Sequence, residues 1–176
     1  MRAKDDIDFS AVDWDSVDEG KAGFIYREAL EHHKGIIENN NRINDKALGL
    51  LSFTMPIMTA LAGYFAISWG GGSPALFAAA LAACVFIFAV VVCLLLVIIP
   101  RGVFRGEGSP GAYFTGEYYK RDMRGLLVGN IVDLHGCILH DGKTLGRRGR
   151  LFGAAVVLCA CLPAVSFLVF LLWPAN

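Results

Sequence analysis

The chain has 176 residues, of which 55% are hydrophobic and 18% are charged, and its formal net charge is +0. A mean hydropathy of +0.52 is typical of a membrane protein with several spans and disfavours a soluble domain. The zero net charge hides an uneven distribution, because acidic residues predominate before Leu48 and basic residues predominate between Arg101 and Arg150.

Residues 1–20 form an acidic N-terminal arm. Apolar residues such as Phe9 and Trp14 interrupt the acidic ones and provide anchors for docking. Two interpretations remain open: the arm docks on a basic cytosolic surface of the same assembly, or it is a solvated, mobile tail. The acidic residues of the arm are Asp5, Asp6, Asp8, Asp13, Asp15, Asp18 and Glu19.

Residues 21–47 are predicted to form a cytosolic amphipathic helix that runs directly into the membrane. Its apolar stripe has the seven-residue period of packed helices. His33 and Asn40 lie beside this stripe. Such polar residues can fix the register of an oligomer, but the helix can equally well pack on its own chain. The stripe consists of Ala22, Ala29, Ile36, Ile43 and Leu50.

Residues 48–100 are predicted to form a transmembrane hairpin. Its two apolar runs, 48–69 and 75–99, contain no Asp, Glu, Lys, Arg or His. A helix crosses a hydrocarbon layer of about 30 Å with roughly 20 residues, and both runs reach that length. Only a short uncharged turn separates them.

The first span has a small and mildly polar face, and Pro56 lies inside it. A face of this kind usually packs against another helix, although in an oligomer it can line a pore. Ser52, Met55 and Thr59 are the predicted pore-lining residues.

Residues 101–150 are predicted to form a basic cytosolic helical insert, followed by a third transmembrane helix at 151–173. The pair Asp141-Gly142 is expected to break or bend the insert helix. The insert is rich in basic residues and the turn between the first two spans has none. The positive-inside rule therefore places the insert and the N-terminus in the cytosol.

The basic and aromatic residues of the insert are a candidate binding site for a nucleotide or short oligonucleotide. Arginine matches phosphate oxygens, and aromatic rings stack on bases. Attraction to anionic lipid headgroups is the alternative explanation. The candidate residues are Tyr118, Tyr119, Lys120, Arg121 and Arg124, together with Lys143, Arg147 and Arg148 beyond the expected break.

No catalytic or metal-binding constellation stands out. The four histidines lack convincing zinc spacing, and no cysteine is placed to complete a site. The spans contain no carboxylate or lysine, which disfavours an ion-coupled transporter. We therefore expect no enzyme activity, metal or cofactor.

The order of parts resembles the small transmembrane effectors of bacterial anti-phage nucleotide-signalling systems, of the SLATT and Pycsar types. Two stretches carry the resemblance: the polar helix from His33 to Leu48, with Asp45-Lys46-Ala47 just before the first span, and the insert from Tyr119 to Leu151. The resemblance implies a homo-oligomer in the bacterial inner (plasma) membrane. It also implies a nucleotide or oligonucleotide signal from a partner nucleotidyltransferase.

The sequence thus predicts an all-α membrane protein with three transmembrane helices, an N-terminal cytosolic helix and a cytosolic helical insert between spans 2 and 3. The leading hypothesis is an oligomeric pore, gated by the signal, that permeabilises the membrane and causes growth arrest or cell death. The acidic arm is a candidate latch on the basic insert. The alternative is a non-conducting membrane anchor or adaptor that recruits a cytosolic partner.

Overall fold

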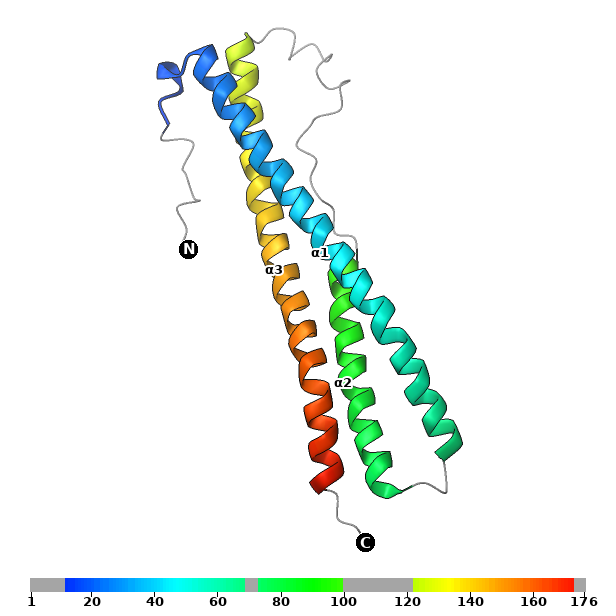
Figure 1. Ribbon diagram of the computed structural model, residues 1–176. Helices are drawn as coiled ribbons and strands as arrows, with labels where there is room; N and C mark the ends of the chain where they lie inside the picture. The colour runs from blue at the N-terminus through cyan, green and yellow to red at the C-terminus, as the bar shows by residue number, and fades with distance from the viewer. Residues whose placement is uncertain (1–11, 69–72, 100–121, 173–176) are drawn as a thin grey trace. The chain divides into compact units, whose positions relative to one another are not determined.

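The computed structural model describes residues 12–68, 73–99 and 122–172, and every regular element in these ranges is helical. A short 3₁₀ turn, η2 (Trp14–Ser16), precedes three long helices: α1 (Glu19–Ser68), α2 (Pro74–Ile98) and α3 (Met123–Leu172) (Figure 1). All three are long and apolar enough to cross a membrane. The all-α class and the three candidate spans are therefore confirmed.

Helices α1 and α3 are each much longer than a membrane span. Each has 50 residues, which at 1.5 Å per residue amounts to about 75 Å of helix. Because a hydrocarbon layer is only about 30 Å thick, each helix must continue outside it as a polar extension. The N-terminal helix runs into the first span without interruption, as predicted, and the last part of the insert likewise forms one helix with the third span.

The expected break at Asp141-Gly142 is wrong, because α3 continues through both residues. Glycine in a helix interior costs only about 0.5–1 kcal/mol relative to alanine. The Asp141 side chain, which competes with helix geometry in a turn, is instead bonded to His33 on α1. Packing against α1 therefore outweighs the local preference for a turn.

The chain divides into two compact units. The first comprises Met1–Asn39 and Arg101–Leu145, and the second comprises Asn40–Pro100 and Gly146–Asn176. In the second unit the last parts of α1 and α3 run in the same direction, and α2 runs antiparallel to both (Figure 1). Its buried core consists of Ala47, Val90, Leu94, Val97 and Ala155.

The first unit pairs the polar extensions of α1 and α3. Among the described residues of this unit, Ala22 on α1 and Ile131 and Leu134 on α3 are the buried apolar ones. A buried polar pair, His33 on α1 and Asp141 on α3, also joins the two helices.

The seven-residue period of α1 is present in the structure. The expected stripe is half-buried or better, and the deepest set lies beside it: His33, Asn40, Ala47 and Thr54 are at most 6% exposed. In both units these positions pack on the chain's own helices.

Candidate functional site

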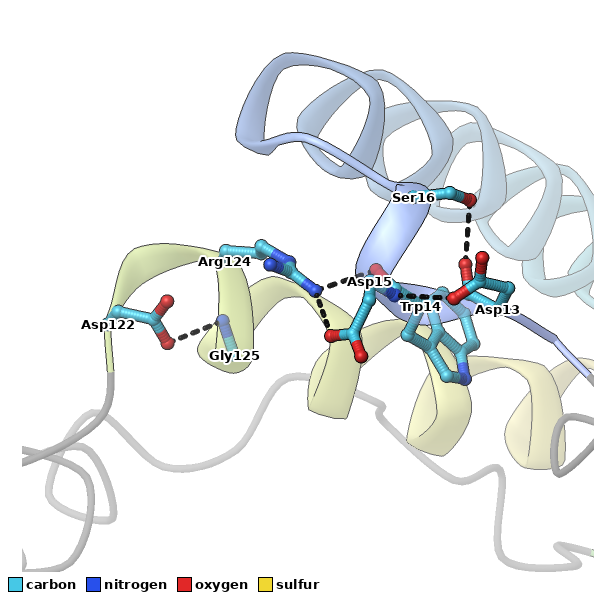
Figure 2. Close-up of polar contacts among 7 residues, drawn as sticks. All are labelled: Asp13, Trp14, Asp15, Ser16, Asp122, Arg124 and Gly125. Atoms are coloured by element: carbon cyan, nitrogen blue, oxygen red, sulfur yellow. Dashed lines mark hydrogen bonds and ion pairs between the residues drawn. The ribbon is translucent and has the colours of Figure 1, made fainter.

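The start of α3 is joined to the turn that precedes α1. The Nη2 of Arg124 donates to the Trp14 carbonyl at 2.7 Å and to Oδ1 of Asp15 at 2.9 Å (Figure 2). Asp13 caps this turn, accepting from the Asp15 amide through its side chain at 3.2 Å and from the Ser16 hydroxyl through its carbonyl at 2.8 Å. The turn therefore presents two oxygen acceptors to one guanidinium nitrogen.

Arg124 occupies an unusual place for a cation. It is the second residue of α3, where the helix macrodipole disfavours positive charge. Asp122 caps the helix by accepting from the Gly125 amide at 3.0 Å. A Cβ at position 125 would lie 2.7 Å from that carboxylate oxygen, so glycine permits the close approach. The carboxylate of Asp15 then compensates the charge of Arg124 directly.

A buried polar pair joins α1 to α3 within the first unit. Nε2 of His33 lies 3.0 Å from Oδ2 of Asp141, and both side chains are about 5% exposed or less. Burying a carboxylate without a partner is costly, so the imidazole stabilises Asp141 inside the helix pair. The two residues are 108 positions apart in the sequence.

The thiol of Cys137 lies on the same stretch of α3, fourteen residues before the charge-free part begins at Leu151. Burial raises the pKa of Cys137 above its ordinary value, and the negative charges of Asp141 and Asp133 raise it further. Its thiolate is therefore disfavoured at neutral pH.

Arg148 makes a second buried contact, within the second unit. Its Nη1 donates to Oδ1 of Asn40 at 2.8 Å, and its Nη2 donates to the Ile99 carbonyl at 2.9 Å. Ile99 is the C-cap of α2, whose last carbonyls need donors and favour a nearby cation. One side chain of α3 thus bonds to α1 and to the end of α2.

The structure places those candidate ligand residues that it describes in different environments. Tyr118, Tyr119, Lys120 and Arg121 lie outside the described residues. Lys143 and Arg147 are exposed, whereas Arg148 is 3% exposed and bonded inside the second unit. In this arrangement the Arg148 guanidinium serves the fold and is not presented to a ligand.

Because α3 is continuous, the basic group that contains Arg124 lies far from the basic group that contains Lys143. Arg124 and Lys143 stand about 28 Å apart along an unbroken helix at 1.5 Å per residue. A mononucleotide is much shorter than this distance, so it cannot contact both groups on one chain.

The predicted pore-lining residues lie on an uncovered face of α1. Ser52, Met55 and Thr59 are exposed in the single chain. The hydroxyls of Ser52 and Thr59 donate to carbonyls one turn earlier, at 2.9 Å and 3.1 Å. This bonding satisfies them in an apolar environment and leaves the face available to lipid, to another copy or to a pore.

The expected docking of the acidic arm on the basic insert is present at one contact, between Asp15 and Arg124. Sequence reasoning missed the contacts of His33 and Arg148. A signal for these two was present, since His33 and Asn40 are seven residues apart on α1 and Asp141 and Arg148 are seven apart on α3. Both pairs have a separation of 108 residues. Matching polar residues at equal spacing on two helices would have predicted the pairing.

Three helices are long and apolar enough to span a membrane, and two of them continue as long polar extensions, which defines an integral membrane protein. A family described as "Pycsar effector protein domain" (PycTM) matches residues 28–175, and the chain belongs to that family. The Pycsar-type resemblance is thereby confirmed. No curated protein and no solved structure matches the chain.

Family membership makes the chain a membrane effector of anti-phage defence. It implies a protein that works with a cyclic nucleotide signal from a partner cyclase. The acidic arm 1–20 precedes the matched residues.

Proposed function

We propose that the chain is a signal-gated, membrane-permeabilising effector: a cyclic nucleotide acts on the polar extensions and changes the packing of the spans. The observation that carries this proposal is the continuity of α1 and α3, each of which runs as one helix from its polar extension into its span. A displacement at the polar end of such a helix is transmitted along it, because packed helices shift as rigid elements.

In this proposal the signal binds at the beginning of α3. Arg124 and the preceding Lys120 and Arg121 provide charge for the phosphate, and Tyr118 and Tyr119 provide rings for the base. In this proposal a cyclic mononucleotide binds to this group and does not reach Lys143 or Arg147. Lys143 and Arg147, close to the charge-free stretch, interact with anionic headgroups in the proposed topology.

Arg148 is the proposed link between the signal site and the spans. The segment with the candidate ligand residues begins directly after Ile99, whose carbonyl accepts from Arg148. We propose that ligand binding changes the bond between the Ile99 carbonyl and Arg148 of α3. The same guanidinium holds Asn40 of α1.

The proposed assembly is a homo-oligomer in the bacterial inner membrane, with the N-terminus and the insert in the cytosol. In this proposal all three helices cross the membrane, so the polar extensions of α1 and α3 lie on the same side of it. Ser52, Met55 and Thr59 line or border the pore in this assembly.

Cells that express the chain together with a nucleotide cyclase provide the test. A potential-sensitive dye should report depolarisation when the cyclase is active, and no change with a cyclase inactivated in its active site. A chain that reaches the membrane and never depolarises it, whichever cyclase is present, would favour the non-conducting adaptor.

A further inference from the structure

The turn before α1 bonds to Arg124, a residue that is also part of the proposed ligand site. Asp15 and the Trp14 carbonyl both accept from Nη2 of Arg124 (Figure 2). The Arg124 side chain is 35% exposed, and the carboxylate of Asp15 is fully exposed. An anion in solution therefore has access to the same guanidinium.

The contact is built by local structure on both sides. On one side, Asp13 caps the turn, and the Val17 amide donates to the Trp14 carbonyl at 3.1 Å. On the other, the Asp122 cap fixes the first turn of α3. The carboxylate of Asp15 is negatively charged and accepts a hydrogen bond from Arg124, as a phosphate oxygen bound to Arg124 would.

We propose that the turn formed by residues 13–18 competes with the anionic signal for Arg124. In the resting chain Asp15 is paired with Arg124, and the phosphate of a cyclic nucleotide displaces Asp15 from it. This inference rests on the proposed function, since it takes Arg124 as part of the signal site.

Displacement of the turn acts on the beginning of α1. Asp18, at the end of the turn, caps α1 by accepting from the Lys21 amide at 2.7 Å, and its carbonyl accepts from the Ala22 amide at 2.9 Å. Ala22 is fully buried. Release of Asp15 therefore frees the segment that anchors the first turn of a helix that continues into the membrane.

The strength of the competition follows from exposure. An exposed ion pair contributes little, so removing Asp15 should tighten nucleotide binding only about two- to five-fold. A contribution of this size is expected of a contact that restrains the resting chain and that a bound nucleotide can still displace.

Hydrogen exchange of the full chain in lipid nanodiscs tests the contact without any ligand. The Asp15→Asn and Arg124→Gln variants should each increase deuterium uptake by peptides covering residues 12–18. Glu19→Gln, which removes an equal charge in the first turn of α1, should not. Combining Asp15→Arg with Arg124→Asp should restore protection. Unchanged uptake in Asp15→Asn would overturn the contact.

Equilibrium dialysis against each 3′,5′-cyclic mononucleotide tests the competition. The expected result is tighter binding by Asp15→Asn than by the wild-type or Glu19→Gln chain, with increased uptake over residues 12–18 when the nucleotide binds to the wild-type chain. Equal affinities would overturn the competition and leave the proposed ligand site standing. If no nucleotide binds to any of these chains, the proposed ligand site fails and the competition with it, whereas the exchange data still report the contact.

Discussion

Arg148 donates to Asn40 across 2.8 Å, and the two side chains are 3% and 6% exposed. The bond joins α3 to α1, and the second terminal nitrogen of the guanidinium bonds to the end of α2. A charged donor in such a place is retained only if its bonds are made, because the cost of burying it is high. It makes Arg148 the polar centre of the second unit.

Replacing Arg148 should destabilise the helix bundle. Arg148→Met leaves the buried Asn40 oxygen and the Ile99 carbonyl without this donor, at an expected cost of about 2–3 kcal/mol. Thermal unfolding in detergent micelles, followed by circular dichroism, measures the loss. Arg147→Met changes an exposed neighbour and should stay within about 0.5 kcal/mol of wild type. Equal stability of the two variants would contradict the assigned role.

The His33–Asp141 pair should behave as a buried pair in a double-mutant cycle. His33→Leu leaves the Asp141 carboxylate buried without its partner, which costs about 3 kcal/mol, or on the order of a hundred-fold in amide protection of the first unit. His33→Leu combined with Asp141→Leu should recover much of that loss. The exposed neighbour variant His32→Leu serves as the control, and a double variant no better than His33→Leu would argue against the pair.

Cys137 should alkylate more slowly than an ordinary thiol at pH 8.5. Burial and the two carboxylates raise its pKa, so the reactive thiolate is less populated at that pH. Asp133→Asn removes one of the negative charges at an exposed position, lowers the pKa and should increase the rate with iodoacetamide. Mass spectrometry of the Cys137 peptide over a pH series gives the rates. A rate that does not depend on residue 133 would show that its charge has no effect on the thiol.

Thr59 distinguishes a pore face from a face that only contacts lipid. Because Thr59 is exposed in the single chain, Thr59→Phe should reduce signal-dependent flux at least several-fold and leave stability within about 0.5 kcal/mol. Ile57→Phe, at a position on the same helix that is 37% exposed, should change neither. Thr54→Phe introduces a large side chain at a buried position and should destabilise the chain. Equal flux in the Thr59 and Ile57 variants would contradict the proposal that Thr59 lines the pore.

The spans could be predicted because their signal is local. Long runs without charge, such as 75–99, leave few alternatives to a membrane helix, and the structure places α2 there. Continuity of α1 was also foreseeable, because no proline or glycine pair separates Lys46 from Leu48. The predicted helix break at Asp141-Gly142 was wrong because the preference for a turn was considered without the partner of Asp141, which lies on a distant part of the chain.

The polar contacts could not be derived from composition or periodicity of one helix alone. Their partners are set by the register between α1 and α3, which depends on tertiary packing. Arg148 is the clearest example: next to Arg147 it looked like another surface cation, yet the two differ completely in exposure. Successive residues of a helix point in directions about 100° apart, so Arg147 faces headgroups or solvent while Arg148 faces the interior of the second unit.

The most direct test of signal-gated permeabilisation is ion flux from liposomes that contain the purified chain, measured with each 3′,5′-cyclic mononucleotide in turn. Signal gating predicts low flux without nucleotide and a large increase with at least one of these nucleotides. That increase should be lost in Arg124→Gln and retained in Glu19→Gln. A folded and membrane-inserted chain that conducts equally with and without every nucleotide, or never conducts, would contradict it.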